Sequence, residues 1–290
     1  MKRSYYKKII EKLNELRKRD CLAQLSACFP DVSSAALESI IAQEIVKKTK
    51  KTTHYHLSKA EIYYKRYLEE KEKEGTKPGF LLKLADKIDF SPALLAKLIL
   101  EQHFKESKED SNNGGFETAS KFDISEMLKN STLIDDPDLA VETRLCILSD
   151  ETYGCVSDVV KNSVGEEFET KLQNQLTELG LSYSDENQLR KRGYDKTPDI
   201  ILDIPIAIDD HVVNWIESKA SFGDDERHEE YLKKQYKSYY YRFGPGLVIY
   251  WAGFIDELNT NHECDIIISD TMPTNITRMD PSLLMKRDVS

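Results

Sequence analysis

Long apolar runs are absent from this sequence of 290 residues, and their absence excludes one broad class of protein. No stretch approaches the roughly 20 consecutive apolar residues that a membrane-spanning helix needs. The opening residues Met1-Lys2-Arg3-Ser4-Tyr5-Tyr6 are charged, and no apolar signal-peptide core follows them. We therefore expect an intracellular protein that does not enter a membrane.

Cysteine is scarce and scattered. The sequence has five cysteines and no Cys-x-x-Cys pair, so neither a disulfide framework nor a zinc site is expected. Reduced, partly buried thiols are the better interpretation, and they favour the nucleus or the cytosol. The five positions are Cys21, Cys28, Cys146, Cys155 and Cys264.

Positive charge is scarce beyond residue 80. Residues 1–80 carry 18 Lys and Arg against 11 Asp and Glu, a net charge of +7. The totals of 41 and 51 leave 23 against 40, or −17, for residues 81–290. The basic amino-terminal part could bind a polyanion, although the rest of the chain is acidic. A solvated helical surface would give the same count, and charge alone favours this simpler interpretation.

The amino-terminal third has the spacing of amphipathic helices. Residues 4–19 and 21–29 predict a long and a short helix, and Asp31 or Ser33 can cap a third that runs through Val46. This outline is typical of a helix-turn-helix unit, although a small helical bundle with a solvated lysine tail fits it equally well. The lysines that could contact phosphates, or serve as an import signal, are Lys47, Lys48, Lys50 and Lys51.

A second helical unit and a linker follow. Residues 80–104 repeat the layout of a short helix and a long helix, with Ser91-Pro92 as the start of the second. The run Ser111-Asn112-Asn113-Gly114-Gly115 is typical of a flexible linker. His54-Tyr55-His56 is interpreted as a loop with neutral histidines. We therefore predict a helical, helix-turn-helix-like region over 1–105, a linker over 106–119 and a further domain over 120–290.

Alternating β-branched residues appear only in the last domain. A helix from Gly165 to Gly180 precedes them, and a segment of helical spacing at 225–241 interrupts them. Helix, strand hairpin, helix and strand make an α/β unit. The predicted strands are 198–208, 212–220, 246–255 and 265–269.

The hairpin brings charged residues together. Because side chains alternate along a strand, Trp215, Glu217 and Lys219 share one face of the second strand. Asp199 and Asp203 share one face of the first strand, opposite an apolar face of Ile200, Leu202, Ile204 and Ile206. Asp199 begins its strand and Glu217 ends the partner strand, so an antiparallel hairpin sets the two carboxylates side by side.

Two carboxylates and a backbone carbonyl form a hard-oxygen site suited to Mg²⁺ or Mn²⁺. Such an ion lowers the pKa of a bound water and offsets charge on a phosphate in the transition state. The amine of Lys219 could orient that water or stabilise the attacked phosphate. Taken one by one, these residues could equally form an exposed ion pair of little value.

The pattern Pro198-Asp199 followed by Glu217-x-Lys219 resembles the PD-(D/E)XK nucleases, which implies a restriction-endonuclease-like α/β core. Glu169 in the preceding helix is similar to the helix glutamate of resolvase-like members, with Glu166 and Glu167 close by. Gln235-x-x-x-Tyr239 in the following helix is similar to the Gln-Tyr element of RecB-like members. Tyr231, Tyr236, Tyr239, Tyr240 and Tyr241 could stack on unpaired bases, but their helical spacing favours packing.

Longer stretches resemble the eukaryotic codanin-interacting nucleases, which are named for a Thr-Pro-Asp motif. The stretches are 193–199, 214–224 and 241–251, and the likeness extends to Tyr64-x-Arg66-Tyr67-Leu68 and Leu98-Ile99-Leu100-Glu101. The resemblance implies a nuclear, divalent-metal-dependent nuclease with a codanin-type partner. By position it assigns the metal to Asp199, Glu217 and the Ser218 carbonyl, catalysis to Lys219, and support to Glu169, Gln235 and Tyr239. Lys196, like the four lysines named above, is a candidate nucleic-acid contact.

We therefore predict a nuclease that uses Mg²⁺ or Mn²⁺ to hydrolyse phosphodiester bonds in nucleic acid, with DNA as the expected substrate. The alternative is an adaptor, in which the nuclease fold serves to bind codanin or a chromatin factor with little or no turnover. The acidic carboxy-terminal part favours the adaptor, since a nuclease surface must tolerate a phosphate backbone. The intact set of Asp199, Glu217 and Lys219 favours the enzyme.

Overall fold

The computed structural model describes residues 1–16, 21–73, 77–109, 121–260 and 265–280. The chain divides into two compact units, each built around its own contacts. The first unit combines Met1–Ile41 with Ser163–Ser290, and the second is Ala42–Asn162. The first unit contains the predicted hairpin.

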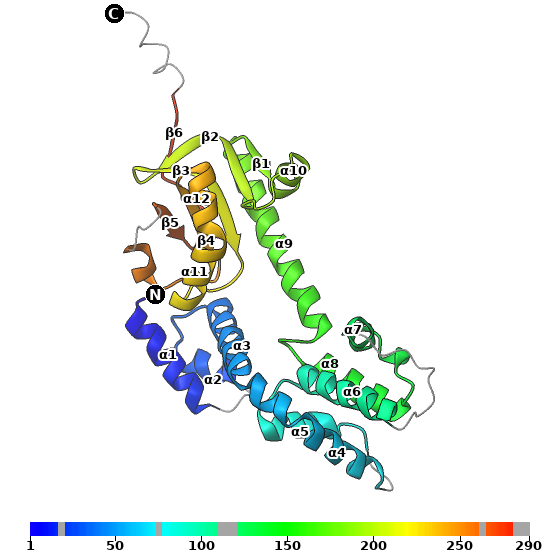
Figure 1. Ribbon diagram of the computed structural model, residues 1–290. Helices are drawn as coiled ribbons and strands as arrows, with labels where there is room; N and C mark the ends of the chain where they lie inside the picture. The colour runs from blue at the N-terminus through cyan, green and yellow to red at the C-terminus, as the bar shows by residue number, and fades with distance from the viewer. Residues whose placement is uncertain (17–20, 74–76, 110–120, 261–264, 281–290) are drawn as a thin grey trace, which may run out of the picture. The chain divides into compact units, whose positions relative to one another are not determined.

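The first unit is built on a mixed β-sheet (Figure 1). β1, β2 and β3 pair antiparallel, whereas β3 with β4 and β4 with β5 pair parallel. β6 pairs antiparallel with the last residues of β2, and the main order is β1-β2-β3-β4-β5. The strands are β1 (Tyr183–Asp185), β2 (Ile200–Ile208), β3 (His211–Lys219), β4 (Gly246–Tyr250), β5 (Ile266–Ser269) and β6 (Ile276–Arg278).

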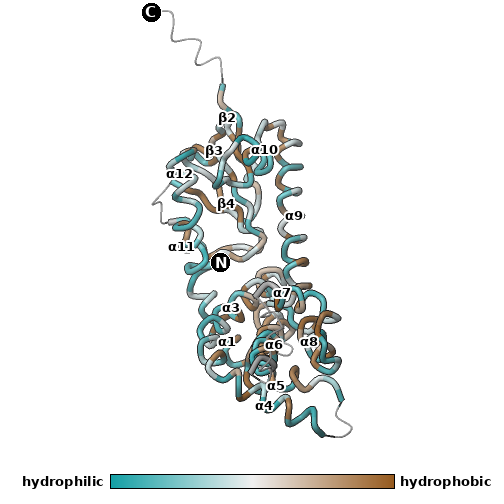
Figure 2. The backbone as a smooth tube through the Cα atoms, turned by 45° about the vertical axis from the view of Figure 1, so that its right-hand side comes forward, coloured by the Kyte–Doolittle hydropathy of each residue, from teal (hydrophilic) through white to brown (hydrophobic). Residues whose placement is uncertain are grey.

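Apolar side chains cover both faces of this sheet. On one face, Trp215 and Tyr250 form a core with Tyr236 and with Ile9 and Leu37 from the amino-terminal helices. Figure 2 shows the hydrophobic colour of β4. Helices on this face are α1 (Arg3–Glu15), α2 (Cys21–Cys28), the first residues of α3 (Ser34–Ser58), α11 (Asp225–Tyr231), the π-helical turn Leu232–Tyr236 and α12 (Lys237–Phe243).

The opposite face packs on α9 (Cys155–Glu178), whose Leu172 and Leu176 are fully buried against strand residues such as Ile216 and Leu247. The short helix α10 (Glu186–Lys191) follows β1, and the 3₁₀ helix Asp256–Thr260 follows β4. Asp185 caps α10 by accepting a hydrogen bond from the amide of Gln188 at 2.8 Å.

The second unit is all helical. Tyr63, Tyr64 and Tyr67 pack with Leu95 and Ile99 in its core. Glu142 and Asp150 are two buried carboxylates that bind backbone amides at the starts of neighbouring helices. The elements are the rest of α3, α4 (Ala60–Lys71), α5 (Phe80–Ile88), α6 (Pro92–Glu109), α7 (Lys121–Lys129), the 3₁₀ helix Ser131–Leu133 and α8 (Pro137–Ser149).

The α/β class, the helical amino-terminal region and the positions of the four predicted strands are confirmed, but the strand predicted over 246–255 ends at Tyr250. The prediction that Ile204 belongs to the apolar face of its strand is wrong. Ile204 is 54% exposed because the β2–β3 register shifts between Ile201 and Ile206. The prediction of a loop at His54-Tyr55-His56 is also wrong, because α3 continues to Ser58. His56 is buried there, and its Nδ1 lies 3.0 Å from the hydroxyl of Tyr63.

The compact units differ from the predicted segments 1–105, 106–119 and 120–290. Helices α1 and α2 share the core of the α/β unit, since Ile9, Leu13 and Leu25 pack with sheet residues. The predicted linker begins inside α6, and its residues 110–119 lie outside the described residues. Which segments fold independently stays a prediction. Within the described ranges, no helix combines the length and apolar composition that a bilayer crossing requires.

Candidate active site

The β2–β3 hairpin places the predicted carboxylates side by side. Asp209 and Asp210 form its turn with φ of 46° and 66°, the left-handed conformation that two-residue hairpin turns favour. Ile200 pairs with Ile216, so Asp199 and Glu217 are neighbours across the two strands. The expected juxtaposition of these two carboxylates is present.

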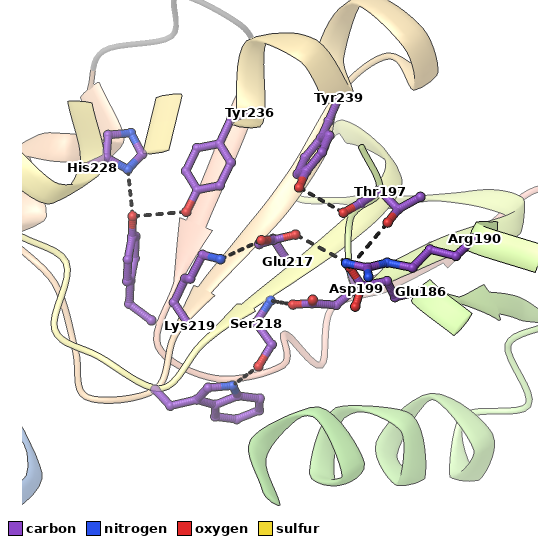
Figure 3. A network of polar contacts seen from close by, with 12 residues as sticks. Glu186, Arg190, Thr197, Asp199, Glu217, Ser218, Lys219, His228, Tyr236 and Tyr239 are labelled. Carbon is purple, nitrogen blue, oxygen red and sulfur yellow. Dashed lines mark hydrogen bonds and ion pairs between the residues drawn. The ribbon is translucent and has the colours of Figure 1, made fainter. Parts of the chain in front are cut away.

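Backbone hydrogen bonds fix both carboxylates (Figure 3). The amide of Ser218 donates to Oδ2 of Asp199 at 2.7 Å, and the amide of Asp199 donates to Oε2 of Glu217 at 3.3 Å. Asp199 Oδ1 accepts no hydrogen bond from the described residues. This oxygen is therefore available to a ligand.

Lys219 lies on the same face of β3 as Glu217, as the alternation predicted. Its Nζ is 2.5 Å from Oε1 of Glu217 and 4.8 Å from the centre of the Tyr231 ring. The Glu217 side chain is only 3% exposed and that of Lys219 only 17%. Removing two charges from water is costly, and the hydrogen bond from the amide of Asp199 to Oε2 of Glu217 offsets part of that cost.

The electrostatics of the site follow from burial. Burial raises the pKa of Glu217, the negative charge of Asp199 raises it further, and Lys219 opposes both effects. Burial also raises the pKa of Asp199. For Lys219, burial lowers the pKa, but the carboxylates of Glu217 and Asp199 outweigh this and raise it overall. Two buried carboxylates therefore share one ammonium group.

Glu169 lies on α9, close enough to Asp199 for the charges of the two carboxylates to interact. Burial raises its pKa to about 6, and the charges of Asp199 and Glu186 contribute in the same direction. Trp251 connects this helix to the hairpin: its Nε1 donates to Oγ of Ser218 at 2.8 Å, and its ring stacks on Phe168 at 5.2 Å. The predicted helix glutamate therefore lies on an element that packs against the carboxylate pair.

Glu186 and Arg190 belong to the site but were not predicted from the sequence. The amide of Glu186 donates to the carbonyl of Asp199 at 3.1 Å, and Arg190 pairs with Glu186 at 2.7 Å. Figure 3 shows both side chains beside Asp199. Asp185 followed by Glu186 was the available signal, because an aspartate cap with an acidic first turn indicates a helix start.

The helical segment after the hairpin covers the other side of the site. The hydroxyl of Tyr239 donates to the carbonyl of Thr197 at 2.8 Å, which holds the Thr-Pro-Asp segment. Gln235 lies in the π-helical turn between Tyr231 and Tyr239, and its Oε1 is buried without a hydrogen-bond partner among the described residues. Single π-helical turns within α-helices are frequent at functional sites.

A chain of buried polar groups lies on the same side as Lys219. The Tyr250 hydroxyl is 3.1 Å from Nδ1 of His228 and 3.3 Å from the hydroxyl of Tyr236 (Figure 3). Burial lowers the pKa of His228, so this imidazole is held neutral. The spacing of Tyr236 favoured a packing role, and His228 was not predicted from the sequence.

The predicted nucleic-acid contacts fall in different places. Lys196 is exposed and precedes Thr197 in the loop that leads to Asp199. The other four lie on α3 in the second unit, so their relation to the carboxylates stays a prediction. Of these, Lys48, Lys50 and Lys51 are exposed, whereas Lys47 lies 3.7 Å from Glu44.

The donor set fits a hard divalent cation. Glu169, Glu186, Asp199 and Glu217 bring four carboxylates to a region with two cationic side chains, Lys219 and Arg190, as the described ion pairs and the raised pKa values indicate. The described residues form no cluster of three or more His, Cys, Asp or Glu side chains arranged to hold a metal. Magnesium commonly uses one or two carboxylates and completes its shell with water. Asp199 and Glu217 could supply those carboxylates.

Comparison with known proteins gives a consistent result over most of the chain. Residues 135–272 match the family described as "Protein of unknown function TPD sequence-motif", and this range contains Thr197-Pro198-Asp199. The chain is 45% identical over 267 residues to CDAN1-interacting nuclease 1 of Homo sapiens, which spans 91% of this chain and 92% of that protein. It is 44% identical over 280 residues to CDAN1-interacting nuclease 1 of Danio rerio, with 96% and 91% covered. No solved structure gives a significant match.

Proposed function

We propose a metal-dependent nuclease activity for this chain, which belongs to the family of the CDAN1-interacting nucleases. The reaction is hydrolysis of phosphodiester bonds in nucleic acid, with DNA as the expected substrate. The observation that carries the proposal is the close arrangement of Asp199, Glu217 and Lys219 where β2 begins and β3 ends, with Glu217 buried. The order of helix, hairpin, helix and parallel strand around it supports a PD-(D/E)XK core.

Each residue has a distinct part in this proposal. Asp199 and Glu217 would hold Mg²⁺ or Mn²⁺ together with the carbonyl of Ser218. When bound, the ion would supply an activated water and offset charge on the phosphate. Lys219 would then orient the attacking water and stabilise the developing negative charge, because its ammonium is fixed within hydrogen-bonding distance of Glu217.

The remaining polar residues would support this centre. Glu169 adds negative charge from α9, Gln235 offers a buried amide oxygen, and Tyr239 holds Thr197, two residues before Asp199. The printed name of the relatives also leads us to propose a codanin-type protein as a partner. We further propose that the protein acts in the nucleus, with Lys47–Lys51 as an import signal.

A hydrolysis assay with purified protein tests the proposal. Labelled single-stranded, duplex and branched DNA, and matching RNA, are incubated with Mg²⁺, with Mn²⁺ or with chelator. We expect cleavage that needs the metal and is lost in Asp199→Ala and Lys219→Ala. Asp203→Asn is the matched control, since Asp203 is exposed on the same strand and bonds to Ser182 outside the site.

The adaptor remains the second candidate because of one observation, the net charge of −17 over residues 81–290. Such a surface repels a phosphate backbone unless cations are grouped locally. The adaptor predicts that wild type cleaves no substrate better than Asp199→Ala or Lys219→Ala, while all three bind the partner equally. Metal-dependent cleavage by wild type alone would exclude it.

A further inference from the structure

The segment from Arg190 to Lys196 is basic, although the chain as a whole is acidic. Its sequence is Arg-Lys-Arg-Gly-Tyr-Asp-Lys, and all seven residues are exposed. Arg242 on α12 adds a fifth cation by contacting Asp195 at 3.0 Å. Glu186 and Asp195 form ion pairs with two of the five cations, Arg190 and Arg242. A local positive surface therefore lies beside the candidate active site.

The pairing of these cations leaves some of them available. Arg190 pairs with Glu186, Arg242 pairs with Asp195, and Arg192 donates to Oγ of Ser184 at 3.1 Å. Neither Lys191 nor Lys196 has an ion-pair partner among the described residues. An exposed ammonium without a carboxylate partner can bind a phosphate at little cost, because no existing ion pair must be broken.

Two exposed tyrosines belong to these two segments: Tyr194 lies within residues 190–196, and Tyr241 on α12 is next to Arg242 in the sequence. The Tyr241 side chain is 79% exposed, and that of Tyr194 is 39% exposed. Tyr194 lies 5.4 Å from the Arg242 guanidinium and 5.9 Å from the Phe243 ring, so its position is fixed by neighbours. A single exposed aromatic residue needs no explanation. Tyr194 stands between the lysines Lys191 and Lys196 in the chain, and exposed aromatic rings near such cations can bind unpaired bases and their phosphates.

Hydrogen bonds hold the segment that joins this surface to Asp199. Nη1 of Arg242 donates to the carbonyl of Lys196 at 2.9 Å, and the Tyr239 hydroxyl donates to the carbonyl of Thr197 at 2.8 Å. The chain reaches Asp199 two residues later. A strand held along Lys191, Tyr194 and Lys196 would therefore lead toward the carboxylates of the candidate active site.

We propose that residues 190–196 and the end of α12 form a binding track for an unpaired nucleic-acid strand, a statement that rests on the proposed nuclease function. Lys191 and Lys196 contact phosphates, and Tyr194 and Tyr241 stack on bases. Bases in a continuous duplex are already stacked and paired, so the tyrosine rings give preference to single strands, flaps or frayed ends. The track thus defines the substrate class of the site.

Fluorescence anisotropy of the full-length chain tests the track without requiring catalysis. Labelled oligothymidylate and a hairpin duplex of equal charge are titrated in chelator at several salt concentrations. The variants are Tyr194→Ala with Tyr241→Ala, and Lys191→Glu with Lys196→Glu. Matched controls are Leu148→Ala, an exposed apolar residue, and Lys83→Glu with Lys87→Glu, two exposed lysines of α5.

We expect wild type to bind the single strand more tightly than the hairpin. The tyrosine variant should lose about tenfold or more in affinity for the single strand, since stacking on each ring contributes measurably. The lysine variant should also weaken the salt dependence, by about 0.7 in the logarithmic slope for each phosphate that is no longer neutralised. The controls should bind as wild type does.

Unchanged single-strand binding in both double variants would overturn the track, as would equal loss in the controls. Because folding could complicate the result, thermal unfolding is measured for each variant, and Tyr194→Phe with Tyr241→Phe should retain most of the binding. Binding in chelator is independent of turnover. An inactive protein that still shows the expected binding pattern would contradict the proposed function and leave the track standing.

Discussion

The ammonium of Lys219 lies 4.8 Å from the centre of the Tyr231 ring and 2.5 Å from Oε1 of Glu217. Tyr231 ends α11, whereas Lys219 ends β3, so two elements hold one charged group. An aromatic face attracts a cation and restricts where it can move. Tyr231 is therefore a positioning residue for Lys219 in the proposed reaction.

Replacing Tyr231 tests this contact. We expect Tyr231→Leu to lower the rate of hydrolysis about 2- to 30-fold, because a cation–π contact contributes about 0.5–2 kcal/mol. Tyr231→Phe keeps the ring and should stay close to wild type. The measurement is kcat and KM on one DNA substrate, with the loss expected in kcat. Equal rates for the Leu and Phe variants would contradict the positioning role.

Replacing two different glycines by alanine should change the free energy of unfolding in opposite directions. A Cβ at Gly246 would lie 2.2 Å from the Trp215 ring, so Gly246→Ala should destabilise the fold by about 1–3 kcal/mol through overpacking. Gly165 lies within α9 with nothing within 4 Å of its Cβ position, and Gly165→Ala should stabilise by about 0.5–1 kcal/mol. Urea unfolding measures both changes, and a Gly246→Ala protein as stable as wild type would contradict this packing.

Glu142 is expected to be a major stabilising residue of the second unit. Its buried carboxylate accepts hydrogen bonds from the amides of Gly79, Phe80 and Leu81, at 2.6, 3.0 and 2.9 Å. Glu142→Ala leaves these amides at the start of α5 unpaired, so we expect a loss of about 2 kcal/mol or more. The exposed neighbour in Val141→Ala should change stability by no more than about 0.5 kcal/mol. Similar unfolding midpoints for the two variants would show that the cap contributes little.

His228 should make stability depend on pH. Burial lowers its pKa in the folded state, whereas the unfolded chain has the ordinary value of about 6.5. The unfolded state therefore binds protons first, and the free energy of unfolding should fall as pH drops below about 6.5. Tyr250 and Tyr236 contact the imidazole, and Asp225 is the charged group that opposes the shift.

Comparison of wild type with His228→Gln isolates this contribution. Urea unfolding at pH 7.5 and pH 5.5 should show a smaller loss of stability in the variant than in wild type. Part of the loss should persist, because burial lowers the pKa of His103 in the second unit as well. An identical pH dependence in the two proteins would contradict a neutral, buried His228.

The hairpin could be predicted because its pattern is local. Alternation fixed the face shared by Glu217 and Lys219, and the Asp209-Asp210 turn fixed the register that sets Asp199 beside Glu217. Ile204 was placed on the wrong face because the register shift within β2 depends on tertiary pairing, and period-two spacing does not carry that information. The carboxylate pair was therefore predictable while part of its own strand was not.

Contacts over long sequence distances were not predictable. Tyr6 stacks on Phe222 at 5.7 Å, and Oγ of Ser39 accepts a hydrogen bond from the Phe222 amide at 2.7 Å. Helices α1 and α3 thus hold the loop that follows Lys219, whereas the spacing of the first three helices fitted a helix-turn-helix unit and a small helical bundle equally well. The strands β1 and β6 have three residues each, too few for alternation to reveal them. Arg190 and Glu186 were missed for the same reason, because α10 is short.

Single-turnover cleavage by Lys219→Met tests the central claim most directly, when metal binding is measured on the same protein by calorimetry. The account predicts that Lys219→Met still binds Mn²⁺ but cleaves DNA at least about a hundredfold more slowly than wild type, because it lacks the group that stabilises developing charge. Glu217→Gln should lose both metal binding and cleavage, and Asp203→Asn should lose neither. Wild type that cleaves no faster than Lys219→Met, or Glu217→Gln that binds Mn²⁺ as wild type does, would contradict the account.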